Sequence, residues 1–184
     1  MNLHKAVFLD RDGTLIVERN YLSSPDQVEI IPGVVEGLQR LAIAGYQLVI
    51  VTNQSGVGRG YFTIERVAEV HDRMFQLMGL DDSFFAGIYI CPHTPSEDCV
   101  CRKPLPELVN RAAADLGLDL AQSWMIGDKP ADLGLAKAAG LRAILVRTGY
   151  GKKYENHPSV VESNALIAND LGNAAKLIID GFLV

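Results

Sequence analysis

The chain has 184 residues, of which 48% are hydrophobic and 21% charged, so it is long enough for one domain, spanning residues 1–184, with a buried core. A formal net charge of −5 and the lack of a basic run argue against nucleic-acid binding and against attraction to anionic membranes. The sequence opens without an apolar signal region and has no uncharged stretch that could cross a bilayer. We therefore expect a soluble, cytoplasmic, monomeric protein with neither nucleic-acid nor membrane partners.

Apolar runs alternate with amphipathic segments along the chain, a pattern typical of an α/β fold. The predicted strands are residues 6–9, 47–51, 88–90, 124–126, 143–146 and, more weakly, 165–167. The predicted helices are residues 34–44, 63–78, 106–116, 131–139 and 171–179. We expect a mostly parallel sheet with helices on both faces, without an interdomain linker or a large inserted cap domain. In such sheets, ligands bind beyond the carboxyl ends of the strands.

The first predicted strand is followed at once by the polar segment Asp10-Arg11-Asp12-Gly13-Thr14. Side chains alternate along an extended backbone, so Asp10 and Asp12 should point to the same side. Two neighbouring carboxylates repel each other unless a cation lies between them or one of them is protonated. Asp-Gly is also a common turn, and that interpretation would be preferred if the segment stood alone.

Three later polar segments also lie behind apolar runs: Thr52-Asn53-Gln54-Ser55, Arg102-Lys103-Pro104, and Gly127-Asp128 with Asp132. Each has an ordinary structural explanation, as a strand end, a solvated pair or a helix cap. Their joint occurrence favours a single phosphate site at the edge of the sheet. The loops 17–27, 56–62 and 91–101 would then determine which substrate is accepted.

These residue types suit the hydrolysis of a phosphate ester. Asp10 can attack phosphorus and form an aspartyl-phosphate, while Asp12 can protonate the leaving oxygen and later deprotonate water. Magnesium prefers oxygen ligands, which Asp10, Asp128 and the main-chain carbonyl of Asp12 could provide. The phosphoryl oxygens would be held by Lys103, Thr52 and Asn53.

The three cysteines of the chain lie in one short window, Cys91-x-His93-x5-Cys99-x-Cys101. An odd number of cysteines argues against a disulfide scaffold. Three thiolates and an imidazole at this spacing suit tetrahedral zinc, and four protein ligands would make the site structural. A chance grouping of reduced cysteines is the alternative. We expect zinc to brace the approach to the neighbouring Arg102-Lys103.

The ordered motifs Asp10-x-Asp12-Gly13-Thr14, Thr52-Asn53-Gln54, Lys103 and Gly127-Asp128-x3-Asp132 resemble those of the haloacid-dehalogenase-like (HAD-like) phosphatases, over about residues 6–148. The resemblance implies a Rossmann-like fold and magnesium dependence. It also implies that Asp10 is the nucleophile and Asp12 the general acid and base, with Asp132 in a supporting role.

With the zinc loop added, the chain resembles a branch of this family that contains heptose 1,7-bisphosphate 7-phosphatases and histidinol-phosphate phosphatases. The five residues between His93 and Cys99 match the histidinol enzymes, whereas the 55–60 segment and Lys129 favour the heptose enzymes. The resemblance implies release of the 7-phosphate of a heptose bisphosphate during the synthesis of activated heptose for bacterial surface polysaccharide. Histidinol phosphate or another small phosphomonoester stays open as the substrate. A zinc-braced module that binds phosphosugars without turnover is disfavoured, because both Asp10 and Asp12 are present.

The same resemblance implies a set of substrate contacts, in which Arg102 and Lys129 suit a second phosphate. Three histidines, His4, His71 and His157, have no partners at useful spacing and are interpreted as surface or packing residues. The glycine-rich segment 56–60 is expected to be a flexible loop, and residues 151–153 a solvated turn. The implied substrate contacts are Glu18, Arg19, Asn20, Tyr21, Thr52, Asn53, Gln54, Ser55, Arg102, Lys103 and Lys129.

Overall fold

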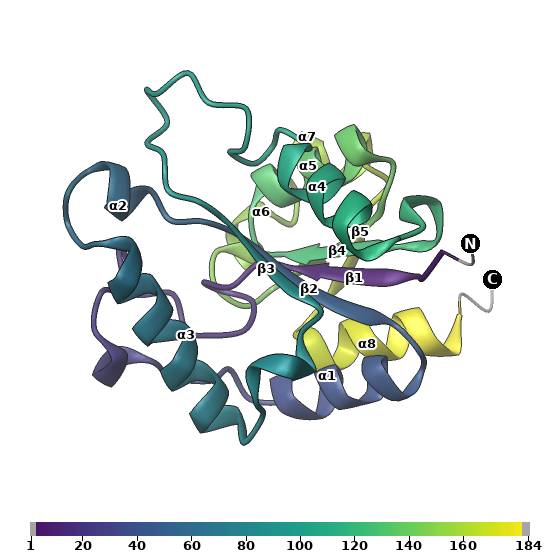
Figure 1. Cartoon of the computed structure of the whole chain (residues 1–184). Coiled ribbons are helices and arrows are strands. Elements are labelled where there is room, and N and C mark those ends of the chain that lie inside the picture. Colours follow the sequence, from purple (N-terminus) through teal and green to yellow (C-terminus); the bar gives the residue numbers. More distant parts are fainter. Residues whose placement is uncertain (1–2, 182–184) are drawn as a thin grey trace.

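The computed structural model describes residues 3–181 and contains one six-stranded sheet (Figure 1). All strand pairs are parallel, in the order β3-β2-β1-β4-β5-β6. The order reverses between β1 and β4, as it does in doubly wound Rossmann-like folds. The expected α/β class is confirmed, and the sheet is entirely parallel. The strands are β1 (Ala6–Leu9), β2 (Gln47–Asn53), β3 (Gly87–Cys91), β4 (Trp124–Gly127), β5 (Arg142–Val146) and β6 (Leu166–Ala168).

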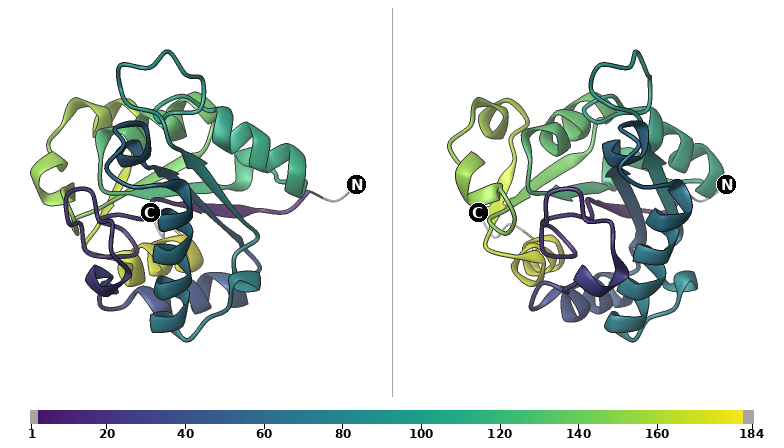
Figure 2. Two further views of the ribbon diagram at one scale, coloured as in Figure 1. Left: turned by 60° about the vertical axis from the view of Figure 1, so that its left-hand side comes forward. Right: turned by 90° about the vertical axis from the view of Figure 1, so that its left-hand side faces the viewer.

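Helices cover both faces of the sheet, as expected (Figures 1 and 2). Helices α1 (Val34–Ile43), α3 (Ile64–Met78) and α8 (Leu171–Asp180) pack on one face, over Val7 and Leu9 of β1. Helices α4 (Glu107–Leu116) and α5 (Pro130–Ala139) pack on the other, over Ala6 and Phe8. Because β1 is buried on both faces, it is apolar throughout rather than alternating.

Local signals in the sequence account for the ends of the longer helices. The Thr63 hydroxyl accepts a hydrogen bond from the backbone N–H of Arg66, which caps the start of α3. Helices α3, α4 and α5 end at Gly79, Gly117 and Gly140, each in the left-handed conformation that glycine adopts without steric cost.

The structure corrects some expectations about short segments. Strand β2 continues to Asn53, so Thr52 lies inside the strand rather than after it. The segment expected as a flexible loop begins with a helical turn, α2 (Ser55–Gly58), and the expected solvated turn begins α6 (Gly151–Tyr154). The remaining short elements are α7 (Pro158–Glu162) and the 3-10 turns η1 (Pro25–Gln27), η2 (Asp82–Phe84) and η3 (Leu120–Gln122).

Among residues 3–181, none of the helices combines the length and the apolar character needed to cross a membrane.

Candidate active site and metal centres

A cavity of about 300 Å³ opens at the carboxyl ends of the strands, next to the point where the strand order reverses. Asp10, Asp12 and Asp132 lie in its wall, with Asp128 buried directly behind. Strands β1 and β4 bring these carboxylates together, because Asp10 follows β1 and Asp128 follows β4. Nine of the expected substrate contacts also line the cavity: Glu18, Asn20, Tyr21, Asn53, Gln54, Ser55, Arg102, Lys103 and Lys129.

Lys103 is buried between two carboxylates. Its Nζ lies 2.7 Å from Asp10 Oδ1 and 2.7 Å from Asp132 Oδ1, and it donates a hydrogen bond to the Val51 carbonyl at 2.9 Å. Burial alone would lower the pKa of Lys103, but the charges of Asp10 and Asp132 outweigh it and raise the pKa above its usual value. Lys103 therefore stays cationic, and it holds Asp10 in a fixed position.

Asp12 is held by two neighbours. The Arg11 guanidinium donates Nε–H to Oδ2 and Nη2–H to Oδ1, both at 3.0 Å, and Gln54 donates to Oδ2 at 2.8 Å. Burial would raise the pKa of Asp12, but the charge and hydrogen bonds of Arg11, with the bond from Gln54, lower it below its usual value. Asp12 is therefore a carboxylate before any substrate binds.

The Asp128 side chain is fully buried. Its Oδ2 accepts the Tyr150 N–H at 2.8 Å, whereas its Oδ1 is buried with no hydrogen-bond partner among the described residues. Burial, with the charge of nearby Asp10, raises the pKa of Asp128 to about 8. Carboxylate oxygens of Asp10, Asp128 and Asp132 lie within 4.8 Å of one another. Lys129 Nζ lies 3.6 Å from Asp128 Oδ1, which is too far for a hydrogen bond. A buried oxygen without a hydrogen bond, placed among acids, is what a divalent cation would satisfy.

The donor set fits magnesium, and the hydrogen bonds indicate which acids are free to bind it. Both oxygens of Asp132 are already used, one by Lys103 and the other by the Lys129 backbone N–H at 3.0 Å. Within residues 3–181, Asp10 and Asp128 each keep one oxygen without a hydrogen bond, so these two acids are the better candidates for binding the cation. The oxygen-only ligands also suit a hard cation better than zinc.

The mouth of the cavity contains charged groups and a strained turn. Lys129 Nζ lies 2.8 Å from Glu18 Oε2, and Glu18 Oε1 accepts the Asn20 N–H at 2.9 Å. Asn20 and Tyr21 have positive φ angles of 45° and 66°, which is uncommon for residues other than glycine. The Tyr21 ring makes an edge contact with Tyr61, with the ring centroids 5.0 Å apart.

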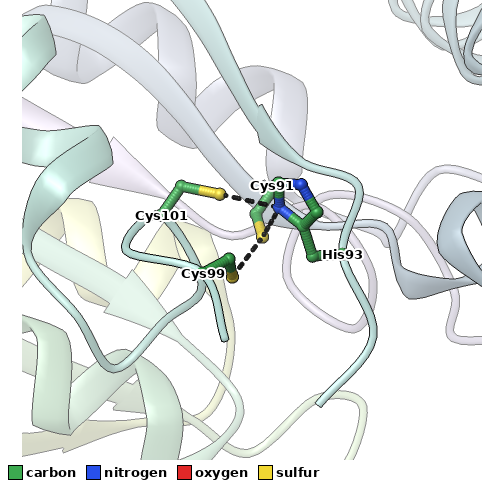
Figure 3. A group of neighbouring side chains, drawn as sticks. All are labelled: Cys91, His93, Cys99 and Cys101. Carbon is green, nitrogen blue, oxygen red and sulfur yellow. Dashed lines mark hydrogen bonds between the residues drawn. The ribbon is translucent and has the colours of Figure 1, made fainter. Parts of the chain in front are cut away.

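The four expected zinc ligands lie close together in the loop that precedes Arg102 (Figure 3). His93 Nδ1 lies 3.2 Å from Cys101 Sγ and 3.7 Å from Cys91 Sγ, and Cys91 Sγ lies 3.9 Å from Cys99 Sγ. Ligands of tetrahedral zinc at the usual bond lengths are about 3.5–3.8 Å apart, so this cluster fits the ion.

The zinc loop is connected to residues of the cavity by hydrogen bonds that involve the backbone. The Arg102 guanidinium donates to the His93 carbonyl at 3.1 Å, and the Gly58 N–H of α2 donates to the Pro92 carbonyl at 2.9 Å. The Asn53 amide accepts the Lys103 N–H at 3.1 Å and donates to the Lys103 carbonyl at 3.3 Å. Figure 2 shows the loop and α2 on the same side of the molecule.

Some expected contacts lie elsewhere. Arg19 does not line the cavity, and its guanidinium pairs with Glu29 at 2.7 Å. Thr52 is buried beneath the cavity, where its hydroxyl accepts a hydrogen bond from Gln54. Asn53 lines the cavity, but its amide is engaged with the Lys103 backbone. In this structure the Thr52 hydroxyl and the Asn53 amide therefore contact other site residues.

Sequence reasoning missed several residues around the site. Tyr150 lines the cavity, and the Thr148 hydroxyl donates to the Gly13 carbonyl at 2.6 Å. Their loop follows β5 at the same carboxyl edge, and this position was the signal that could have identified them. His71, expected to lack a partner, is buried with Nε2 3.3 Å from Arg11 Nη1. Leu22, Gly56, Phe62 and Ala131 complete the lining.

Known proteins resemble this chain in sequence and in structure. A family model described as HAD-hydrolase-like matches residues 100–174. A protein of Haemophilus ducreyi is 44% identical over 79% of this chain and 84% of its own length. One from Pasteurella multocida is 40% identical, with coverages of 89% and 94%. Both are named D-glycero-beta-D-manno-heptose-1,7-bisphosphate 7-phosphatase.

A solved structure is similar over nearly the whole chain. It is D,D-heptose 1,7-bisphosphate phosphatase from B. bronchiseptica, complexed with magnesium and phosphate. Its TM-score is 0.87 at 33% sequence identity, and the match covers 96% of this chain and 98% of that one.

Proposed function

Because this chain belongs to the HAD-like hydrolases, in the family of the D-glycero-beta-D-manno-heptose-1,7-bisphosphate 7-phosphatases, we propose that it releases the 7-phosphate of that heptose bisphosphate. The observation that carries the proposal is the grouping of Asp10, Asp12 and Asp128 at one cavity, since these residues provide a nucleophile, a proton carrier and a cation site. The product would serve bacterial synthesis of activated heptose for surface polysaccharide.

In the first step, a carboxylate oxygen of Asp10 bonds to phosphorus as the bond from phosphorus to the sugar oxygen breaks. The departing oxygen takes the electron pair of that bond and a proton from Asp12. The negative charge of bound phosphate raises the pKa of Asp12, which can then carry the proton that a phosphomonoester monoanion brings. In the second step, a water oxygen bonds to phosphorus as the bond from phosphorus to the Asp10 oxygen breaks, and Asp10 becomes a carboxylate again. Asp12, now also a carboxylate, accepts the proton that this water loses.

The remaining groups of the site bind the two phosphate groups and orient Asp10. Lys103 keeps Asp10 in place and presents a positive charge to the phosphoryl group. Magnesium would be held by Asp10, Asp128 and the main-chain carbonyl of Asp12, where it neutralises phosphate charge. Arg102 and Lys129 lie at the cavity and suit the second phosphate, which stays outside the reaction.

The zinc site and the setting of the enzyme are part of the proposal. Cys91, His93, Cys99 and Cys101 would hold a structural zinc that keeps Arg102 and Lys103 in position. Thiolate ligands require a reducing compartment, which supports a cytoplasmic location. The monomeric state stays a prediction, to be checked by light scattering.

The test is phosphate release from a panel that contains the heptose 1,7-bisphosphate, other sugar phosphates and histidinol phosphate, with and without magnesium. We expect the heptose bisphosphate to have the highest kcat/KM, and phosphorus NMR to identify the product as the 1-phosphate. A higher kcat/KM for histidinol phosphate would overturn the proposed substrate assignment. Release from no member would favour the binding module.

Asp10→Asn should abolish turnover while circular dichroism stays unchanged. The matched control is Asp72→Asn, on the exposed side of α3, which should keep full activity. Normal turnover by Asp10→Asn would contradict the mechanism.

A further inference from the structure

Arg11 is one of the largest side chains to be fully buried, with only 1% of its surface exposed. A guanidinium cannot lose its proton in a protein, so burying it is costly unless its N–H groups are paired. Its two hydrogen bonds to Asp12 form a parallel fork that fixes both the position and the rotation of the carboxylate. Lysine could supply the charge but not this geometry.

The far side of the guanidinium meets a second buried group. His71, on α3, is 4% exposed, and its Nε2 lies 3.3 Å from Arg11 Nη1. A guanidinium has only donors, so Nε2 must be the acceptor and the ring proton must lie on Nδ1. Burial and the charge of Arg11 lower the pKa of His71 to about 3, which keeps the ring neutral. The face of the His71 ring stacks on the Phe75 ring, with the ring centroids 6.4 Å apart.

We propose that Arg11 and His71 are positioning residues for proton transfer by Asp12, with His71 fixing the guanidinium and the guanidinium fixing the carboxylate. The inference rests on the proposed phosphatase function, and specifically on Asp12 as the proton donor. The proposal gives helix α3, which lies outside the catalytic motifs, a role in orienting Asp12.

The proposal predicts a dependence on the leaving group. As the bond from phosphorus to the leaving oxygen breaks, a sugar alkoxide needs a proton from Asp12, because it is a strong base. A p-nitrophenolate is stable as an anion and leaves without one. A misplaced Asp12 should therefore slow the cleavage of sugar phosphates much more than the cleavage of p-nitrophenyl phosphate.

The experiment compares kcat/KM for the sugar phosphate that is cleaved fastest and for p-nitrophenyl phosphate. This ratio covers the steps up to departure of the leaving group, so later attack by water does not enter it. The variants are His71→Leu, which removes the acceptor, His71→Met, which leaves only a weak thioether acceptor, and His71→Gln, which can supply a strong one. His71→Leu and His71→Met are both used because one of them could fail to fold, and the melting temperature is recorded for each.

The matched control is Phe75→Leu, which disturbs the same helix and the His71 ring without removing the link to Arg11. We expect His71→Leu and His71→Met to lose about tenfold in kcat/KM for the sugar phosphate, and less than about threefold for p-nitrophenyl phosphate. His71→Gln should recover most of the loss, and Phe75→Leu should show no selective loss.

Equal losses on both substrates, no loss on either, or the same selective loss in Phe75→Leu would overturn the positioning role. If the wild type cleaves neither substrate, the proposed function fails, and this inference fails with it. If the wild type is active and the variants lose no selectivity, only the positioning role fails.

Discussion

At the scale of single residues, the site is organised by pairs of opposite charges that are removed from water. Lys103 between Asp10 and Asp132 is the central example, since each partner is almost fully buried. Breaking such a group leaves an uncompensated buried charge, which costs more than the intact group contributes.

Lys103→Met should therefore destabilise the protein by roughly 3–5 kcal/mol, because it leaves two buried carboxylates without their cation. Urea unfolding at neutral pH measures the change. Lys137→Met is the matched control, because Lys137 forms an exposed pair with Glu162 and should hardly shift the unfolding midpoint. Similar midpoints for the two variants would contradict this view of Lys103.

His71 should make stability depend on pH in a known direction. Its pKa is about 3 in the folded protein and is ordinarily 6.5, so below pH 6.5 the unfolded chain binds a proton that the folded protein does not. Its contribution is fully present above pH 6.5 and decreases as the pH falls toward 3, by at most about 1.4 kcal/mol per pH unit. The groups that act on it are Arg11 and Asp12.

The measurement is urea unfolding between pH 7 and pH 4 for the wild type and His71→Gln. We expect a flatter pH profile in the variant, because glutamine does not titrate. Parallel profiles would mean that other groups account for the whole acid dependence.

Gly149 should be intolerant of a side chain. A Cβ there would lie 2.2 Å from Asp128 Oδ2, and its φ is +54°. Gly149→Ala should weaken magnesium binding measured by calorimetry, in addition to a backbone cost of about 1–2 kcal/mol. Gly79→Ala is the control, since φ is +66° there and no described atom lies within 4 Å of its Cβ. The prediction fails if the two variants bind magnesium equally well.

Which site residues the sequence could identify depended on where they stand in the chain. Asp10, Asp12, Lys103 and Asp128 stand directly behind apolar runs or in a recognisable order, so topology brings them together. The contact from His71 to Arg11 spans 60 residues, and it depends on how α3 packs, which no local pattern contains.

At the scale of elements, the zinc loop links three parts of the molecule. Cys91 ends β3, Pro92 accepts a hydrogen bond from α2, and Arg102 reaches back to His93. The loop is irregular, so its position depends on these few contacts, and a zinc ion held by its four ligands would fix it further.

Cys99→Ser should lose zinc, measured as about one ion per chain in the wild type, because serine is a poor zinc ligand. We also expect a lower melting temperature and reduced phosphate release, since Arg102 and Lys103 follow the loop. Val100→Ser changes an exposed neighbour and should retain the metal. If a zinc-free variant kept full activity, phosphate release would not depend on zinc in the loop.

Long elements were predictable because their apolar period and their caps agree. Helix α3 has both Thr63 at its start and Gly79 at its end. Short helices were not predictable, because four or five residues are too few to show the apolar repeat of a helix. The start of α7 is instead defined by Pro158 at the first helical position and by the His157 ring, which accepts a hydrogen bond from the Ser159 N–H.

At the scale of the whole molecule, folding confines three acids to one water-poor place at the reversal of the strand order. A cation that binds only the folded state stabilises all of it by mass action. Magnesium at about 100 times its dissociation constant should add about 2.7 kcal/mol to unfolding. Urea unfolding across a magnesium titration measures this, and Asp128→Asn should abolish most of the effect. A magnesium effect that survives this substitution would place the ion elsewhere.

The strained pair Asn20 and Tyr21 has a consequence for protein engineering. Each residue holds a left-handed conformation that costs of order 1 kcal/mol, and glycine at either position would relieve that backbone strain. The same exchange would remove groups that line the mouth of the cavity. A design that only removes backbone strain would therefore change these residues and return a less selective catalyst. These positions should be kept constant when the protein is stabilised.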